Sequence, residues 1–313
     1  MVITMKIAII GAGAMGMLFG AKLQLAGNDV TMVDVVPTVL DAISANGIIM
    51  REGDNVRNVP IKAGRAEDVE GWVDLAILFT KTLYSKSALT SAVNTFVGPD
   101  TYILTLQNGI GNVELIRSFV KLEKVLVGVT NYASDVEGPG KIAPTGDGYV
   151  KLMSANLEDS PMLHSVEQAL SQAGLQTTVT PQVFEAIWEK VGFNAAVNSM
   201  TAICRIPVGG VGITEEGRKL AFHIADETAA VAQAHGVQIL AENIHASLNN
   251  AFGAHKDHFT SMAQDVLKKR RTEVAYINGG IVRKAAEKGL QVPYTEAVYD
   301  LLRVIEETYA LQP

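Results

Sequence analysis

Three polar residues recur at intervals of four in the segment WEKVGFNAAVNSMTA, which covers residues 188–202. They are Lys190, Asn194 and Asn198. Residues four apart lie on one face of an α-helix, so this spacing would place an ammonium and two amides along a narrow strip among Ala, Val and Phe. Because Asn is a mediocre helix former, its use here indicates a hydrogen-bonding role, either toward a ligand or as a cap on a neighbouring loop.

A carboxylate that could partner the lysine comes later, in FTSMAQDVLKKRRTEVAYINGG. Glu273 stands ahead of the apolar and aromatic stretch VAYI, and a carboxylate buried there would need a partner. Lys190 would be a suitable one. Ser261 lies three residues before Gln264, which is the pattern of a capping box, so this serine could simply begin a helix.

The glycine-rich string GAGAMG covers residues 11–16. It follows a predicted strand at 6–10, opens a predicted helix, and is followed by a second strand at 29–33. This context predicts a dinucleotide site, with the pyrophosphate at the helix N-terminus, whereas the alternative is a glycine turn that binds no nucleotide. The residues that would contact the cofactor are Gly11, Gly13, Ala14, Met15 and Gly16.

Asp34 ends the second strand, about twenty residues beyond the glycines. A carboxylate at this position can accept hydrogen bonds from the ribose 2′-hydroxyl and would repel a 2′-phosphate, which favours NAD over NADP. The alternative is that Asp34 caps the segment VPTVLDAI that follows it.

The elements that would position these residues change character along the chain. The first half alternates strand and helix signals, which predicts an α/β fold with a Rossmann-type doubly wound sheet over residues 1–180. Its Gly- and Pro-rich segment 137–153 predicts an antiparallel extension. Residues 181–313 predict an all-helical second domain. Strands are expected at 6–10, 29–33, 74–79, 101–106 and 124–130, and helices at 162–174, 214–236, 238–252, 260–288 and 294–311.

Together these segments resemble the ketopantoate reductase (2-dehydropantoate 2-reductase) family over nearly the whole chain. The order and spacing of the pieces carry the resemblance. They are KIAIIGAGAMG at 6–16, FTK at 79–81, LQNGIG at 106–111, WEK-x₃-N-x₃-N at 188–198, and SMAQD-x₇-EVAYINGG at 261–280.

The resemblance implies a role for each matching residue. Lys190 would protonate the oxygen as a ketone becomes an alcohol, and Glu273 would position that lysine and help to bind the substrate. Lys81 would lie on the cofactor side. The substrate would contact Asn108, which also lies near the nicotinamide, and Asn194, Asn198 and Ser261.

One position departs from the family. Family members that use NADPH commonly carry an arginine just after the second strand, where this chain has Val35. The first hypothesis is therefore reduction of a branched 2-keto acid to its (R)-2-hydroxy acid, with NAD favoured and NADP possible. Within the family, the alternative is an NAD-dependent D-2-hydroxyacid dehydrogenase of the D-mandelate type. An alternative of another class is a nucleotide-sensing protein without turnover, although a sensor would need no proton donor.

Composition limits the other possibilities. The net charge of −7 argues against binding to nucleic acid, and no apolar run approaches the length of a membrane span. We therefore expect a cytoplasmic enzyme without a signal peptide or a metal site, and the resemblance implies a homodimer. The single cysteine, Cys204, is predicted to be a buried thiol, and the basic run at 268–271 a solvated helix face.

Overall fold

The structure is a computed structural model that describes residues 4–312. The chain forms two compact units. The first comprises the chain up to Gln107 together with Asn112–Val183, and the second comprises Asn108–Gly111 together with the chain from Phe184. The first unit is α/β and the second is helical, so the predicted fold class is confirmed.

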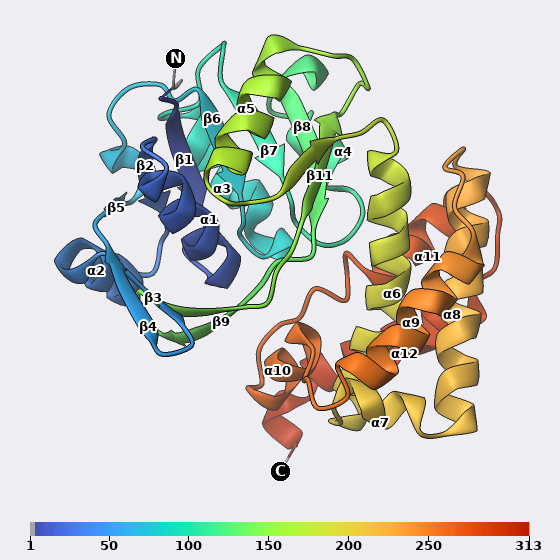
Figure 1. The fold of residues 1–313 in the computed structure, drawn as a ribbon. Coiled ribbons are helices and arrows are strands. Elements are labelled where there is room, and N and C mark those ends of the chain that lie inside the picture. The colour runs from blue at the N-terminus through green and yellow to red at the C-terminus, as the bar shows by residue number, and fades with distance from the viewer. Residues whose placement is uncertain (1–3, 313) are drawn as a thin grey trace. The chain divides into compact units, whose positions relative to one another are not determined.

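The first unit contains an eight-stranded sheet whose central strands are parallel (Figure 1). Among the described residues, only β8 and β11 pair antiparallel within this sheet. In spatial order its strands are β12 (Thr177–Val179), β11 (Val150–Ser154), β8 (Val125–Thr130), β7 (Tyr102–Thr105), β6 (Leu75–Leu78), β1 (Lys6–Ile10), β2 (Asp29–Val33) and β5 (Lys62–Gly64). The five strands predicted from the sequence are all present, with ends that differ by at most one residue.

Helices cover both faces of this sheet, as a doubly wound topology requires. The helices of this unit are α1 (Ala14–Leu25), α2 (Pro37–Asn46), α3 (Ser85–Val93), α4 (Asn112–Ile116) and α5 (Pro161–Gln172). On one face, Ile10 of β1 shares a buried cluster with Leu89 of α3 and Ile116 of α4. On the other face, Gly16 and Gly20 of α1 lie over Ile9, so the absence of side chains lets this helix approach the sheet closely.

A second sheet packs against α1 and was only partly predicted. Its order is β4 (Asn55–Val59), β3 (Ile48–Glu52), β10 (Lys141–Thr145) and β9 (Ala133–Gly138). The antiparallel pair β9–β10 corresponds to the extension expected near 137–153. The β3–β4 hairpin was missed because β4 is almost wholly exposed and lacks an alternating apolar pattern.

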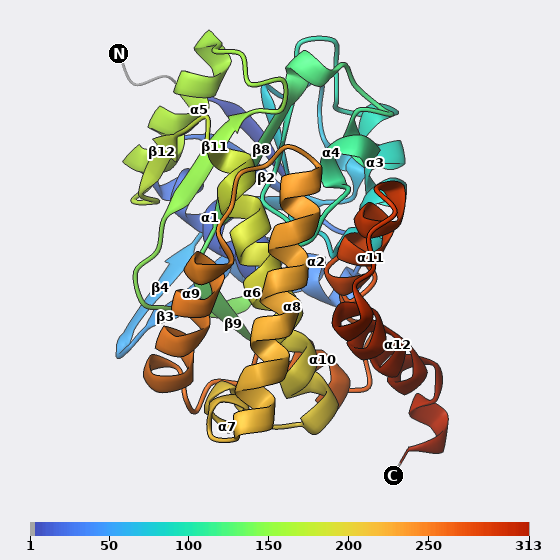
Figure 2. The same cartoon turned by 90° about the vertical axis from the view of Figure 1, so that its right-hand side faces the viewer.

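The second unit consists of helices packed around a single buried core. In Figure 2, α8 runs through its middle, and it contacts α7, α9, α11 and α12. The helices are α6 (Val183–Cys204), α7 (Val208–Gly212), α8 (Glu215–Ala234), α9 (Ala241–Ala254), α10 (Ser261–Leu267), α11 (Asn278–Glu287) and α12 (Pro293–Glu307). Short 3₁₀ turns complete the fold at 66–68, 82–84, 122–124 and 309–311.

Two of the sequence predictions are wrong. The helix expected at 260–288 is instead two helices, α10 and α11, joined by an irregular segment that contains the basic run. The run leaves the helix because the backbone amide of Arg270 turns back to the carbonyl of Asp265, and Lys269 adopts a left-handed φ of 51°. Cys204 is exposed, because it is the last residue of α6 and lies at the edge of the core.

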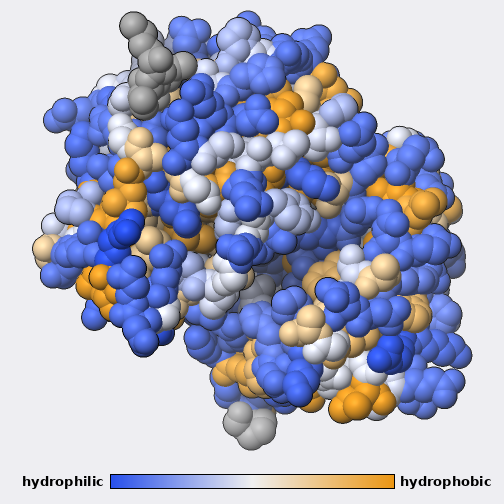
Figure 3. Space-filling model, in the orientation of Figure 1, coloured by the Kyte–Doolittle hydropathy of each residue, from blue (hydrophilic) through white to orange (hydrophobic). Residues whose placement is uncertain are grey.

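The surface shown in Figure 3 is predominantly hydrophilic, with hydrophobic residues in small patches. Such scattered apolar exposure is ordinary for a protein surface. Among residues 4–312, no helix is long and apolar enough to cross a membrane.

Candidate active site

The loop between β1 and α1 gives each glycine of the string a different role. Gly11 has a φ of 106°, and a Cβ there would lie 2.6 Å from the backbone nitrogen of Thr80. A Cβ on Gly16 would lie 1.9 Å from the carbonyl oxygen of Gly11. Gly13 has open space on its Cβ side and precedes Ala14 and Met15 as a helix cap without a side-chain hydrogen bond. The first amides of α1 are thus accessible to an anion, which fits the pyrophosphate of a dinucleotide.

The Asp34 side chain bonds to backbone amides on two sides. One carboxylate oxygen accepts from the Ala12 amide at 2.6 Å, and the other accepts from Val35 at 2.7 Å and Val36 at 3.0 Å. Val36 is the N-cap residue of α2 and this helix has no side-chain cap hydrogen bond, so Asp34 precedes the helix without capping it, and the alternative interpretation is wrong. Each carboxylate oxygen can accept two hydrogen bonds, so the oxygen that faces Ala12 retains a position for a ribose hydroxyl.

A polar network lies at the ends of β6 and β7. The side-chain amide of Gln107 donates to the Ser85 hydroxyl at 2.8 Å and to the Thr80 carbonyl at 2.5 Å. Lys81 follows Thr80 directly and is partly buried at the start of a 3₁₀ turn. Lys81 was among the predicted site residues, whereas Gln107 and Ser85 were not predicted, although Gln107 stands in the LQNGIG motif.

Asn108 belongs to the second unit and bonds there to the predicted acidic residue. Its side-chain amide donates to Glu273 at 3.3 Å, and the next residues of the loop are fixed by a hydrogen bond from the Ile110 amide to the Tyr276 carbonyl at 2.9 Å. Gly109 has a φ of 94°, and a Cβ on it would lie 2.6 Å from that same carbonyl oxygen. Only glycine fits between Asn108 and Tyr276, which explains the NG pair in the motif.

Helix α6 carries Lys190, Asn194 and Asn198 on consecutive turns, as the spacing predicted. Asn194 and Asn198 are 7% and 6% exposed, yet neither side-chain amide has a hydrogen-bond partner within the part of the chain that the structure describes. The alternative that they cap a neighbouring loop is therefore wrong. Nearly buried amides need partners, so these two are candidates for binding a ligand.

The ammonium of Lys190 lies below the protein surface, although the residue as a whole keeps some exposure. Burial disfavours its charged form and lowers its pKa to about 8, while the negative charge of Glu273 opposes this shift. Desolvation is the larger effect. A lysine with a pKa of about 8 can give up a proton during a reaction far more readily than an exposed one.

Ser261 is the first residue of α10, but it is not the cap. The side chain of Thr260 accepts from the Ala263 amide at 3.2 Å and also bonds to Thr201 of α6 at 2.7 Å. Ser261 itself is exposed. The interpretation of Ser261 as the capping residue was therefore wrong. The capping residue is Thr260, which directly precedes the serine and is itself a common N-cap residue type.

The second unit thus brings Lys190, Asn108 and Glu273 together, and it places Asn194 and Asn198 further along the same helix as the lysine. No contact places Ser261 beside them within the described residues. The glycine loop, Asp34 and Lys81 are all in the first unit.

Two family models match the two parts of the chain separately. The ketopantoate reductase PanE/ApbA family matches residues 7–156, and the ketopantoate reductase PanE/ApbA C-terminal family matches residues 182–306. The chain belongs to the ketopantoate reductase family. The predicted resemblance is confirmed, and this ketopantoate reductase family member is an oxidoreductase that uses a nicotinamide cofactor.

Individual relatives cover almost the full length of this family member. The 2-dehydropantoate 2-reductase of Streptococcus pyogenes serotype M1 is 30% identical over 309 residues, which is 98% of this chain and 100% of the relative. A structure of D-mandelate dehydrogenase with NADH and anilino(oxo)acetate is 31% identical with a TM-score of 0.92, covering 97% of this chain and 99% of the other. The structure of 2-dehydropantoate 2-reductase from Geobacter metallireducens is 29% identical with a TM-score of 0.89. It covers 95% of this chain and 98% of the other chain.

Proposed function

We propose that this enzyme reduces a 2-keto acid to the (R)-2-hydroxy acid, with Lys190 as the proton donor. The observation that carries the proposal is the buried Lys190 ammonium, whose pKa is lowered to about 8 and which interacts with the carboxylate of Glu273. Asn108 bonds to the same carboxylate. An ammonium at this position matches the charge that develops on the carbonyl oxygen during reduction.

Each residue of the site has a separate role in the reaction. The nicotinamide cofactor supplies a hydride to the keto carbon when bound. Lys190 then stabilises the negative charge on the former carbonyl oxygen and gives it a proton. Glu273 keeps Lys190 charged until that step, because its carboxylate raises the lysine pKa against the effect of burial. Asn194 and Asn198 bind the substrate's carboxylate and any hydroxyl group through their free amides, and we assign Ser261 to the same task.

We assign NAD as the preferred cofactor. Asp34 keeps one acceptor position for a ribose hydroxyl and would repel a 2′-phosphate. Val35, where an arginine would clasp that phosphate, is 74% exposed and offers no charge. The comparison with D-mandelate dehydrogenase supports this choice, because that protein was solved with NADH.

Ketopantoate is the first candidate substrate, since the curated relatives are 2-dehydropantoate 2-reductases. A second candidate, a D-2-hydroxyacid of the mandelate type, is favoured by the combination of Asp34, Val35 and the likeness to D-mandelate dehydrogenase. A homodimer and a cytoplasmic location stay predictions, and light scattering on the purified protein would test the first.

A kinetic panel tests the proposal. We would measure kcat/KM for ketopantoate, 2-ketoisovalerate, 2-ketoisocaproate and benzoylformate, each with NADH and with NADPH. The expected result is turnover of at least one keto acid with a preference for NADH. Tight cofactor binding without turnover of any keto acid would contradict the proposal, and a preference for NADPH would remove Asp34 from its assigned role.

The pH profile tests the proton donor separately. Reduction requires protonated Lys190, so kcat/KM for the keto acid should be level below pH 8 and fall as the pH rises above the lysine pKa of about 8. Oxidation of the hydroxy acid requires neutral Lys190 and should show the opposite dependence. A profile without this transition would contradict the assignment.

A further inference from the structure

The segment that carries Glu273 lacks regular structure. Residues 268–277 run between α10 and α11 without a helix of their own, and Glu273 lies at the start of a turn within them. A helix bonds its own backbone amides, whereas an irregular segment needs other partners for them. Within the segment, the Glu273 carbonyl accepts from the amides of Tyr276 and Ile277, whereas the amide of Thr272 finds its partner outside the segment.

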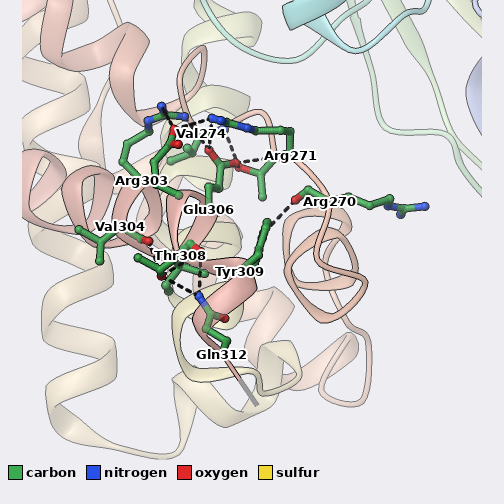
Figure 4. A network of polar contacts seen from close by, with 12 residues as sticks. Arg270, Arg271, Val274, Arg303, Val304, Glu306, Thr308, Tyr309 and Gln312 are labelled. Carbon is green, nitrogen blue, oxygen red and sulfur yellow. Dashed lines mark hydrogen bonds and ion pairs between the residues drawn. The ribbon is translucent and has the colours of Figure 1, made fainter.

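The principal outside partner is Glu306, near the end of α12 (Figure 4). Its side chain is only 1% exposed. One carboxylate oxygen accepts from the backbone amide of Thr272 at 2.6 Å and from the Thr272 hydroxyl at 2.7 Å. The other accepts from Arg303 at 2.7 Å. A buried carboxylate on α12 is thus joined to the residue that directly precedes Glu273.

The Thr272 hydroxyl extends this link to the far side of Glu273. While it donates to Glu306, it accepts from the backbone amide of Val274 at 3.1 Å. Val274 is itself fully buried in the core of the second unit. Thr272 is therefore bonded to the Glu306 carboxylate directly and Val274 is connected to it through the Thr272 hydroxyl, so these bonds restrict the path of the backbone through Glu273.

Other contacts fasten the start of the segment. The Tyr309 hydroxyl donates to the Arg270 carbonyl at 2.8 Å, and Arg270 pairs with the buried Asp265. Burial raises the pKa of Tyr309 to about 12, so this phenol remains a donor at any physiological pH. Figure 4 shows Tyr309 beside Arg270 and Glu306 beside Arg271.

Two arginines lie beside the Glu306 carboxylate. Arg303 donates to it and Arg271 lies 3.6 Å away, while the like charge of Glu307 is itself paired with both arginines. Burying a carboxylate is costly unless it is paired and hydrogen-bonded, and Glu306 meets both conditions. Two of its hydrogen bonds are with a single residue of the irregular segment, Thr272, rather than with another helix.

We propose that Glu306 and Thr272 are positioning residues for the active site, which place the Glu273 carboxylate beside Lys190 and Asn108 by fixing the backbone on both sides of it. This inference rests on the proposed roles of Lys190 and Glu273. Neither positioning residue is assigned a contact with substrate or cofactor.

The test is a double-mutant cycle that combines Thr272→Val with Glu273→Gln. Valine has nearly the shape of threonine but can neither donate to Glu306 nor accept from Val274. In the wild-type background, Thr272→Val should lower kcat roughly ten- to a hundredfold, since small misplacements of catalytic groups have effects of this size. In the Glu273→Gln background it should lower kcat by less than about twofold, because the group it positions is already neutral.

Further variants separate positioning from stability. Glu306→Gln should reproduce the effect of Thr272→Val. Thr272→Ser keeps the hydroxyl and should therefore retain a kcat within about threefold of the wild-type value. The matched control is Glu307→Gln, which removes a neighbouring carboxylate that bonds to Arg271 and Arg303 but to no backbone group of the segment. This control should leave kcat unchanged.

The pH profile supplies a readout that a merely structural role would not move. If Glu273 is displaced, its raising effect on the Lys190 pKa is lost, so kcat/KM for reduction should begin to fall at a lower pH than in the wild type. Thr272→Val and Glu306→Gln should both show this shift, and Thr272→Ser and Glu307→Gln should not.

The outcomes are distinguishable. Equal losses from Thr272→Val in both backgrounds, or a lower melting temperature with an unmoved pH profile, would overturn the positioning role and leave the proposed function intact. If Glu273→Gln alone retained wild-type kcat and pH profile, the proposed role of Glu273 would fail, and the positioning role with it.

Discussion

The two units present their functional groups in different ways. In the first unit the groups are mainly backbone amides at the start of α1, and Gly11, Gly13 and Gly16 expose them. In the second unit the groups are side chains, on α6 and on the irregular segment that carries Glu273. A backbone site depends on local conformation, whereas a side-chain site depends on distant partners.

The separations in sequence make this difference concrete. The glycine loop is built from six consecutive residues and is completed by Asp34, whose bond to Ala12 spans 22 residues. The bond between Asn108 and Glu273 spans 165 residues. A mutation in the glycine loop should therefore act through steric fit, and a mutation at Lys190 or Glu273 through charge and placement.

The largest effect is expected for Lys190→Ala. Removing the proton donor should lower kcat roughly 10²- to 10⁴-fold, the usual contribution of a general acid. Because the glycine loop and Asp34 belong to the other unit, the dissociation constant for NADH should stay unchanged. Steady-state kinetics and a fluorescence titration would measure the two quantities.

The matched control is Lys219→Ala, which removes an exposed lysine from α8 in the same unit. It should retain wild-type kcat. A Lys190→Ala variant with near wild-type turnover would show that the lowered lysine pKa has no part in the chemistry.

Within the first unit, Gly16→Ala and Gly13→Ala should separate folding from binding. A Cβ on Gly16 meets the Gly11 carbonyl at 1.9 Å, so the alanine should cost about 1–3 kcal/mol of unfolding free energy or more. Gly13 has a φ of −78° and open space, so alanine fits there without strain. Its methyl group should instead obstruct the pyrophosphate and weaken cofactor binding.

Thermal melts with and without NADH measure both effects. If Gly13→Ala bound NADH as tightly as the wild type, the glycine loop would not be the phosphate site. Equal melting temperatures for the two variants would contradict the packing argument for Gly16.

The same contrast explains how much could be predicted from the sequence. The strands at 6–10 and 29–33 were predicted to the residue, because a short apolar run beside a glycine turn is a local signal. The strip of Lys190, Asn194 and Asn198 was also visible, since helical spacing places its members without knowledge of the rest of the fold.

What could not be predicted depends on distant partners. The irregular segment that follows the break at Lys269 bonds through Thr272 to Glu306, which lies 34 residues away on an amphipathic helix. Helical spacing places Glu306 on the buried face with Val298 and Leu302, but it does not indicate which residue this carboxylate bonds to. Gln107 and Ser85 were missed for the same reason, because their hydrogen bond joins residues 22 apart.

A smaller effect is expected for Val35→Arg, which tests how the first unit distinguishes a 2′-hydroxyl from a 2′-phosphate on the adenosine ribose. An added guanidinium beside the 2′-position should shift the ratio of kcat/KM values toward NADPH by roughly ten- to a hundredfold, the equivalent of a charged hydrogen bond of about 1.5–3 kcal/mol. Val56→Arg places the same charge at another exposed position of the first unit, on β4, and should not change the ratio. An unchanged ratio in Val35→Arg would indicate that the 2′-position lies elsewhere.

The smallest effects are expected for the adjacent pair Thr260→Ala and Ser261→Ala in the second unit, which parallels Gly16 and Gly13. Thr260 caps α10 and bonds to Thr201, so alanine should cost about 1 kcal/mol and lower the melting temperature by a few degrees. Ser261 is exposed and caps nothing, so its loss should leave the melting temperature unchanged. If it binds substrate, KM should rise about three- to tenfold, as for the loss of one neutral hydrogen bond. A lower melting temperature with an unchanged KM for Ser261→Ala would indicate that this serine caps α10. The proposed substrate-binding side chains on the second unit would then include Asn194 and Asn198 but not Ser261.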